Sequence, residues 1–186
     1  MEFSKKLMYG LVFLLVVGAG VAALYTFKST PVITQEYPDL FVFDYKRDSD
    51  DIRKLMKEDW WWLVEGDGFS VDNMLMKLSP RDENYAGQYK IIVARKDNQF
   101  VGFVAYYRKY FFEGFINFLA VRPEFRGQGY AQKLIDYAIE RMKQEGVSEV
   151  TLGTRIENIR AQTVYLRKGF KETRRDNSFV YYAKPV

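Results

Sequence analysis

The first apolar run of the sequence reaches from Leu7 to Phe27, contains no charged residue and has a lysine at each end. As a helix, its 21 residues would rise about 31 Å, which is close to the thickness of the hydrocarbon core of a bilayer. The pattern predicts a transmembrane anchor over residues 7–27, preceded by an N-terminal flank at residues 1–6. A cleaved signal peptide and a buried core helix are the two alternatives.

After this run, residues 28–39 contain two prolines and are predicted to form an extended linker. From residue 40 to residue 186 the hydrophobic positions switch between period 2, typical of strands, and period 3.6, typical of helices. The predicted elements are a strand at 40–43, a helix from Asp48 or Ser49 to Leu63, a helix at 70–78, strands at 89–94, 100–107 and 115–121, a helix at 131–142, a strand at 147–152, a helix at 158–168, and strands at 170–173 and 179–183. This order predicts one α/β domain over residues 40–186, with a mixed β-sheet and helices on its faces.

Three tryptophans, Trp60, Trp61 and Trp62, stand next to one another in the first predicted helix of this domain. Three consecutive residues cannot share one face of a helix. We therefore expect two of them in the core and one at the surface.

The composition removes several classes of chemistry. The chain contains no cysteine and no histidine, which excludes thiolate nucleophiles, disulfides, histidine-dependent catalytic triads and histidine-ligated metals. We therefore expect no metal site. The net charge is +4, but the 28 basic and 24 acidic residues are interspersed, so the sequence does not indicate broad nucleic-acid binding.

The segment between the strand at 115–121 and the helix at 131–142 carries the strongest chemical signal. It reads Leu-Ala-Val-Arg-Pro-Glu-Phe-Arg-Gly-Gln-Gly-Tyr-Ala over residues 119–131, with glycines at 127 and 129. Glycine lets the backbone approach a ligand closely, and the start of a helix presents free N–H groups and a positive dipole end. With Arg122 and Arg126 nearby, the segment is suited to bind a phosphate or pyrophosphate. It matches neither the nucleotide-triphosphate loop nor the dinucleotide fingerprint.

The same segment resembles motif A of the GCN5-related N-acetyltransferase (GNAT) superfamily, whose core Arg/Gln-x-x-Gly-x-Gly/Ala is met by Arg126, Gly129 and Ala131. About thirty residues later, a second set of residues resembles the second signature helix of that family: Asn158, Ala161, Tyr165, Gly169 and Phe170. The resemblance covers the chain from about Leu40 to its C-terminus.

This resemblance implies the acyl-CoA N-acyltransferase fold, with acetyl-CoA as co-substrate and a primary amine as acceptor. Backbone groups of one stretch would hold the pyrophosphate of acetyl-CoA: Arg126, Gly127, Gln128, Gly129, Tyr130 and Ala131. The backbones of Leu119 and Val121 would pair with the pantetheine arm as an added strand does. The side chain of Asn158 would contact the end of that arm, although Asn158 is equally suited to cap the last helix.

The resemblance also implies that Tyr165 is the general acid that protonates the departing thiolate. A phenol of pKa near 10 suits that task, and a buried core tyrosine is the alternative. Glu113, just before the central strand, is one candidate for a general base. Asn117 stands where some relatives carry an acidic residue, which puts a carboxylate base at that position in doubt.

Together these features lead us to expect a membrane-anchored N-acetyltransferase whose acceptor, a small molecule or a protein, the sequence does not identify. A non-catalytic acyl-CoA-binding regulatory module is the alternative. The lysines around the anchor favour an external domain. Because acetyl-CoA is mainly cytosolic, however, we expect a single-pass membrane protein with its catalytic domain on the cytoplasmic side.

Overall fold

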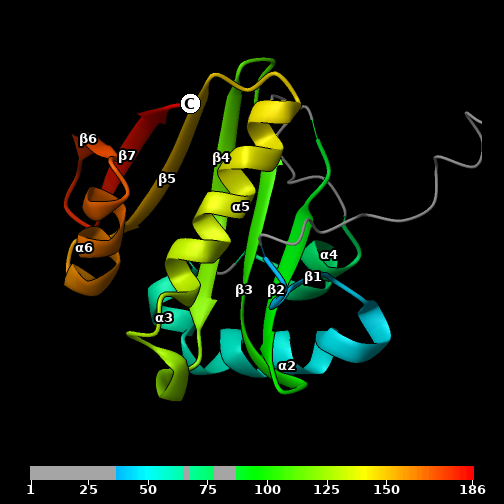
Figure 1. Cartoon of the computed structure of the whole chain (residues 1–186). Helices are drawn as coiled ribbons and strands as arrows, with labels where there is room; N and C mark the ends of the chain where they lie inside the picture. Colours follow the sequence, from blue (N-terminus) through cyan, green and yellow to red (C-terminus); the bar gives the residue numbers. More distant parts are fainter. Residues whose placement is uncertain (1–36, 65–67, 78–86) are drawn as a thin grey trace, which may run out of the picture. The chain divides into compact units, whose positions relative to one another are not determined.

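The computed structural model describes residues 37–64, 68–77 and 87–186, all of which belong to the unit Ile33–Val186. In these residues seven strands form one mixed sheet in the order β1-β2-β3-β4-β5-β7-β6 (Figure 1). The strands are β1 (Leu40–Val42), β2 (Lys90–Lys96), β3 (Gln99–Arg108), β4 (Glu113–Val121), β5 (Glu149–Arg155), β6 (Lys171–Arg175) and β7 (Phe179–Pro185). Pairing is antiparallel except between β4 and β5, which confirms the predicted mixed α/β sheet.

The helices are α2 (Tyr45–Glu58), α3 (Trp60–Leu63), α4 (Val71–Leu75), α5 (Tyr130–Gln144) and α6 (Ile159–Arg167), with a short 3₁₀ turn η1 (Pro123–Phe125). Local sequence explains several of their ends. The side chain of Ser70 accepts a hydrogen bond from the N–H of Asn73 and caps α4, and Gly146 takes a positive φ of 86° just after α5. Between β2 and β3, Asp97 and Asn98 both have positive φ, as a tight hairpin turn requires.

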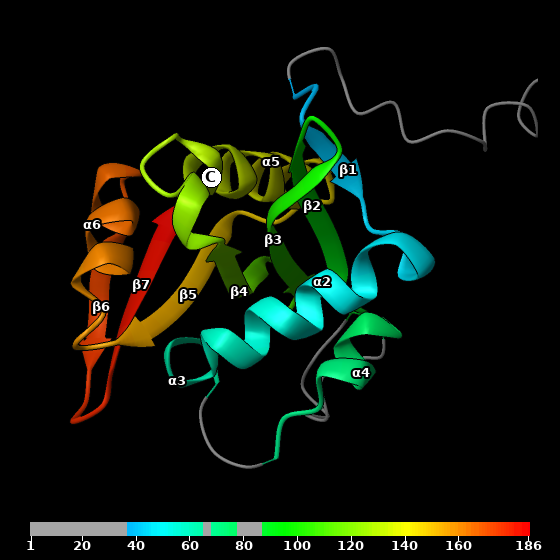
Figure 2. The same ribbon diagram turned by 90° about the horizontal axis from the view of Figure 1, so that it is seen from below.

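Two hydrophobic clusters cover the two faces of the sheet, and the ribbon has α5 on one face and α2 with α4 on the other (Figure 2). On one face, α5 contributes Leu134, Ile135, Ala138 and Met142 to a cluster with the inward side chains of the strands. On the other face, α2 and α4 contribute the side chains Ile52, Leu55, Met56, Met74 and Leu75. The sheet therefore forms the central layer. The turn that follows β4 lies at the C-terminal end of this central strand and leads into α5.

Strands β4 and β5 run side by side only at their beginnings. Their register starts at Glu113↔Glu149 and ends at Ile116↔Leu152, and β5 then continues along β7 to Arg155↔Phe179. The separation of the two strands is visible in Figure 1. At the point of divergence the register of β4 with β3 shifts by one residue, because Asn117 is inserted between Ile116 and Phe118. Such a bulge bends the strand that carries it.

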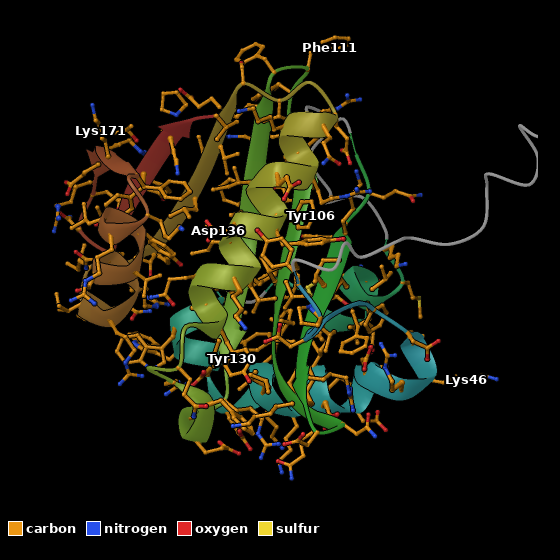
Figure 3. The ribbon with its side chains drawn as sticks, in the orientation of Figure 1. Lys46, Tyr106, Phe111, Tyr130, Asp136 and Lys171 are labelled. Atoms are coloured by element: carbon orange, nitrogen blue, oxygen red, sulfur yellow. The ribbon has the colours of Figure 1, made fainter. Side chains whose placement is uncertain are left out.

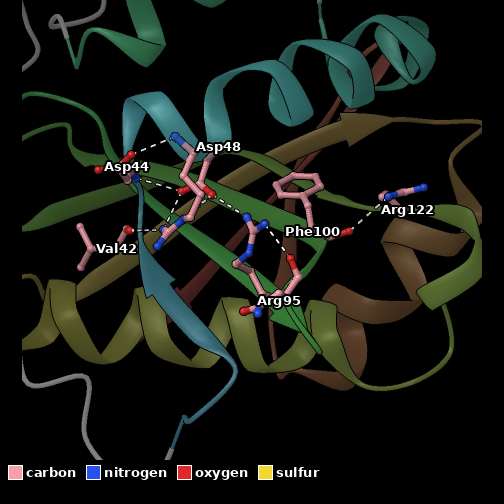
Figure 4. Close-up of polar contacts among 8 residues, drawn as sticks. Val42, Asp44, Asp48, Arg95, Phe100 and Arg122 are labelled. Atoms are coloured by element: carbon pink, nitrogen blue, oxygen red, sulfur yellow. Dashed lines mark hydrogen bonds and ion pairs between the residues drawn. The ribbon is translucent and has the colours of Figure 1, made fainter.

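The helix predicted from Asp48 or Ser49 to Leu63 differs from the observed α2 at its start and at its end. The cap is Asp44, whose carboxylate accepts from the N–H of Arg47 at 2.9 Å, whereas we expected Asp48 or Ser49. Asp48 is instead fully buried inside the helix. Its oxygens accept hydrogen bonds from Arg47 at 2.7 and 2.8 Å and from Arg95 of β2 at 2.6 Å (Figure 4). At Asp59 the helix is interrupted, and α3 continues as a separate turn.

In residues 37–64, 68–77 and 87–186, no helix combines the length and the apolar character that a membrane crossing requires. The localisation that we predicted, a single-pass membrane protein with a cytoplasmic catalytic domain, is contradicted by this finding. The apolar run at residues 7–27, on which that prediction and its signal-peptide and core-helix alternatives depended, lies outside the described residues.

Candidate active site

The turn between β4 and α5 presents a backbone surface that side chains leave open. Gly127 and Gly129 have φ values of 77° and 86°, in the left-handed region that favours glycine. A Cβ atom added at either glycine would meet no atom of the described part of the chain within 4 Å. Gly129 is the N-cap of α5, and among the residues that the structure describes no side chain caps the first N–H groups of that helix. These amides are therefore free to bind an anion.

The arginines of this turn are less available than the sequence suggested. Arg126 donates from Nε to the carbonyl oxygen of Val121 at 2.8 Å and from Nη2 to Asp59 at 2.7 Å. Arg122 forms an ion pair with Glu124 at 2.5 Å. Attraction of an anion to this turn must therefore come mainly from backbone amides and the positive end of α5. Figure 3 shows Tyr130 at this end of the helix.

The edge of β4 that precedes the turn has open hydrogen-bonding groups. The N–H of Arg122 donates to Val101 of β3 at 2.9 Å, so Arg122 faces β3. Because backbone groups alternate along a strand, those of Val121 and Leu119 face the opposite side, from which β5 has diverged. The carbonyl of Val121 is used by Arg126, which leaves both groups of Leu119 and the N–H of Val121 at this open edge.

Asn158 and Tyr165 lie on α6, as the sequence predicts. Asn158 is the N-cap, and its Oδ1 accepts from the N–H of Ala161 at 3.2 Å, which leaves its amide nitrogen for another partner. Tyr165 is buried, with its ring 5.9 Å from that of Tyr182 and 6.2 Å from that of Phe170. Burial raises the pKa of the Tyr165 hydroxyl well above its ordinary value, and Tyr182 adds to this shift. The hydroxyl therefore keeps its proton throughout the neutral pH range.

The structure does not bring Glu113 to the turn. Glu113 is the first residue of β4, and the turn follows the last, so about 26 Å of strand separates them. Its carboxylate accepts from the hydroxyl of Thr151 at 2.7 Å and pairs with Lys109 at 3.4 Å, contacts that hold the start of the sheet together. Asn117 lies closer, at the bulge, and its amide donates to the hydroxyl of Tyr89 at 2.6 Å.

The contacts of Asp59 and Arg155 were not predicted from the sequence. Asp59 holds Arg126, and Arg155, at the end of β5, places its guanidinium 3.9 Å from the ring centre of Trp61. No local pattern marks either contact, because the partners are far apart along the chain. The expectation for the three tryptophans is also wrong, since the exposed fractions of Trp60, Trp61 and Trp62 are 38%, 60% and 42%.

Within the described ranges, no cluster of three or more Asp, Glu, His or Cys side chains could hold a metal ion. The arrangement at the turn instead suits an elongated, anionic ligand. The N–H groups at the start of α5 offer donors for a phosphate, and the open edge of β4 offers one further strand pairing beside them.

Comparison with known proteins finds similarity to acetyltransferases. The family model described as Acetyltransferase (GNAT) family matches residues 37–170. N-alpha-acetyltransferase 30 of Saccharomyces cerevisiae is 41% identical over 69 residues, which cover 37% of this chain and 38% of the yeast protein. The ribosomal protein bS18-alanine N-acetyltransferase of Haemophilus ducreyi is 41% identical over 68 residues, which cover 36% of this chain and 45% of that protein.

Solved structures share the fold at lower identity. A chain in the crystal structure of the NatC complex bound to Gag peptide and CoA superposes with a TM-score of 0.62 at 22% identity, covering 79% of this chain and 97% of that one. The matched segments span less than half the length of the two curated relatives. The family model, in contrast, covers the sheet from β1 to β5 together with α5 and α6. The chain therefore belongs to the acetyltransferase (GNAT) family.

Proposed function

We propose that this chain is an N-acetyltransferase that moves the acetyl group of acetyl-CoA to a primary amine by direct attack of the amine on the thioester. The observation that carries the proposal is the open edge of β4 leading into a glycine turn whose N–H groups are free. The two glycines without neighbours at their Cβ positions leave room for the pyrophosphate of acetyl-CoA. The transferase domain is proposed to span residues 40–186, after a linker at 28–39.

The residues of the turn would bind the co-substrate through their backbone. The N–H of Arg126 already donates to the carbonyl of Pro123 at 3.2 Å, so the N–H groups from Gly127 to Ala131 would donate to the pyrophosphate, where the dipole of α5 favours negative charge. Leu119, and the N–H of Val121, would pair with the amides of the pantetheine arm. Asn158 can contribute its free amide nitrogen while its Oδ1 continues to cap α6.

Tyr165 is proposed as the proton donor to the sulfur of CoA as the carbon–sulfur bond breaks. The phenol is protonated at neutral pH, as a proton donor must be, although burial raises its pKa and makes it a weaker acid than an exposed tyrosine. The acetyl carbon forms its new bond to the amine nitrogen, which gives up a proton to solvent. We do not carry Glu113 forward as the base, because its contacts place it at the far end of β4.

For the acceptor, we propose the α-amino group of a peptide or protein. The names of both curated relatives specify transfer to nitrogen, and the yeast name specifies an α-amino nitrogen. The solved complex that shares the fold was crystallised with a peptide and CoA.

The test is a panel of acceptors, with release of the CoA thiol as the measurement. Peptides with a free α-amine and no lysine are compared with the same peptides formylated at the N-terminus, and with a polyamine and an amino sugar. We expect thiol release only with free α-amines. Turnover confined to the polyamine or the sugar would overturn the acceptor assignment. Tight acetyl-CoA binding without turnover on any amine would favour a regulatory CoA-binding module over an enzyme.

A further inference from the structure

Arginine side chains contact helix α3 at both of its ends, and its hydrophobic packing is slight: Leu63 packs partly buried against the core, and the ring of Trp60 lies 6.5 Å from that of Phe69. None of its four residues is buried, and three of them are exposed tryptophans. A single helical turn with so little buried surface is not stable by itself. Its position must therefore depend on the contacts made at its two ends.

At the N-terminal end of α3, the side chain of Asp59 does not form the capping hydrogen bond that its position favours. An aspartate at an N-cap usually accepts from the N–H groups of the first helical turn. The side chain of Asp59 forms no such bond, and its Oδ2 accepts from Nη2 of Arg126 at 2.7 Å. The exposed fractions of the two side chains are 20% and 28%, so the pair is largely shielded from water. The carboxylate is thus committed to the glycine turn.

Arg126 connects three segments through one planar group. Its Nε binds the carbonyl of Val121 at the end of β4, its Nη2 binds Asp59, and its own backbone leads directly into Gly127. A guanidinium presents its donors in a rigid fork, so movement of one partner shifts the other.

The C-terminal end of α3 is tied to β5. Arg155, the last residue of that strand, donates from Nε to the carbonyl of Trp61 and from Nη2 to the carbonyl of Val64 at 3.3 Å. Helix α3 therefore reaches from the glycine turn to the end of β5, across the space where β4 and β5 have diverged.

We propose that Asp59 and Arg126 are a positioning pair that links the glycine turn to α3, so that CoA bound at the turn changes the placement of the tryptophan helix. The inference rests on the proposed function, because it concerns the response to CoA. An anion on the N–H groups that follow Arg126 draws the guanidinium towards it, and the ion pair passes this shift to Asp59 and α3. Helix α3 then takes its final placement only when the co-substrate is present.

The chain provides its own reporter for this coupling. Its only three tryptophans all lie on α3, so tryptophan emission reports on this helix alone. The experiment is a titration of the full chain with CoA, following tryptophan emission, with calorimetry on the same samples to measure binding. We expect CoA to change the emission of the wild type with the affinity that calorimetry gives.

Asp59→Asn and Arg126→Gln should each reduce the emission change at saturating CoA by roughly three- to thirtyfold. In the double variant the emission change should be reduced no further than in the single variant with the larger reduction, because the two residues act as one pair. Asp72→Asn, which removes a carboxylate from the surface ion pair with Arg53, is the matched control and should respond as the wild type does. If D59N loses its circular dichroism, R126K replaces it, because a lysine cannot bridge Asp59 and Val121 together.

Two results would overturn the positioning pair: CoA binding without an emission change in the wild type, or an unchanged response in D59N and R126Q. Failure of CoA to bind the wild type is a different result. Calorimetry identifies it, and it would overturn the proposed function and this inference with it.

Discussion

Replacing Gly129 by alanine tests whether the glycine turn binds acetyl-CoA. Gly129 has φ 86° and ψ −3°, a left-handed conformation that costs an alanine about 1–2 kcal/mol. No atom lies within 4 Å of the added Cβ, so no steric cost is added in the free protein. The free energy of unfolding should therefore fall by about 1–2 kcal/mol, which corresponds to a decrease in Tm of roughly 2–8 °C.

The effect on acetyl-CoA should be larger than this strain. The new methyl group would stand among the N–H groups at the start of α5, where the pyrophosphate is proposed to bind. Loss of one charged hydrogen bond costs about 1.5–3 kcal/mol, or roughly a 10- to 150-fold rise in the dissociation constant. Urea denaturation measures the first effect and calorimetry with acetyl-CoA measures the second.

Gly146→Ala separates strain from binding. Gly146 also has φ 86° and, among the described residues, no neighbour within 4 Å of its Cβ position, but it follows the other end of α5, about 25 Å along the helix axis from Gly129. It should lose similar stability and keep its affinity for acetyl-CoA. Equal losses of affinity in the two variants, or unchanged affinity in G129A, would refute the reasoning.

Three further predictions follow from individual side chains. Tyr165→Phe should keep acetyl-CoA affinity by calorimetry and lose roughly 10²- to 10⁴-fold in turnover, whereas unchanged turnover would remove Tyr165 as the acid. Burial raises the pKa of Tyr106 and of Tyr165 in the folded protein. Above about pH 10, the ordinary pKa of tyrosine, these residues lose their protons in the unfolded chain but keep them in the folded one. Stability should be intact below about pH 10 and fall above it by about 1.4 kcal/mol per pH unit for each such tyrosine, and Tyr106→Phe should make that slope shallower in urea titrations. Asp48→Ala removes the buried carboxylate that Arg95 and Arg47 share, and should lower the unfolding free energy, measured by urea denaturation, by about 3–5 kcal/mol. Loss of an exposed ion pair would lower it by about 1 kcal/mol or less.

Much of the fold can be predicted from the sequence, because hydrophobic periodicity and turn residues are local signals. The alternation over residues 89–107 with Asp97 and Asn98 between its halves predicts the β2–β3 hairpin, and both turn residues have the positive φ that such a turn requires. The apolar stripe of α5 and the glycine after it predict that helix within two residues at each end. Each of these signals depends on residues a few positions apart, and the observed elements keep them.

Other features of the candidate site are set by partners distant in sequence. Asp48 has the side chain of a helix cap, yet Arg95, 47 residues away, draws it into the protein and leaves the cap to Asp44. Helix α2 ends at Asp59, whose carboxylate pairs with Arg126 across 67 residues, and the three tryptophans that follow on α3 are exposed.

The sequence by itself determined the order of the elements, the glycine turn between β4 and α5, and the residues of α6 that resemble the family's second motif. Only the tertiary structure decided that β7 lies between β5 and β6, that β4 and β5 diverge after Ile116, and that Glu113 is remote from the turn. The physical reason is that periodicity and turn chemistry act between near neighbours, whereas strand order and ion pairing depend on which distant segments the packed core brings into contact.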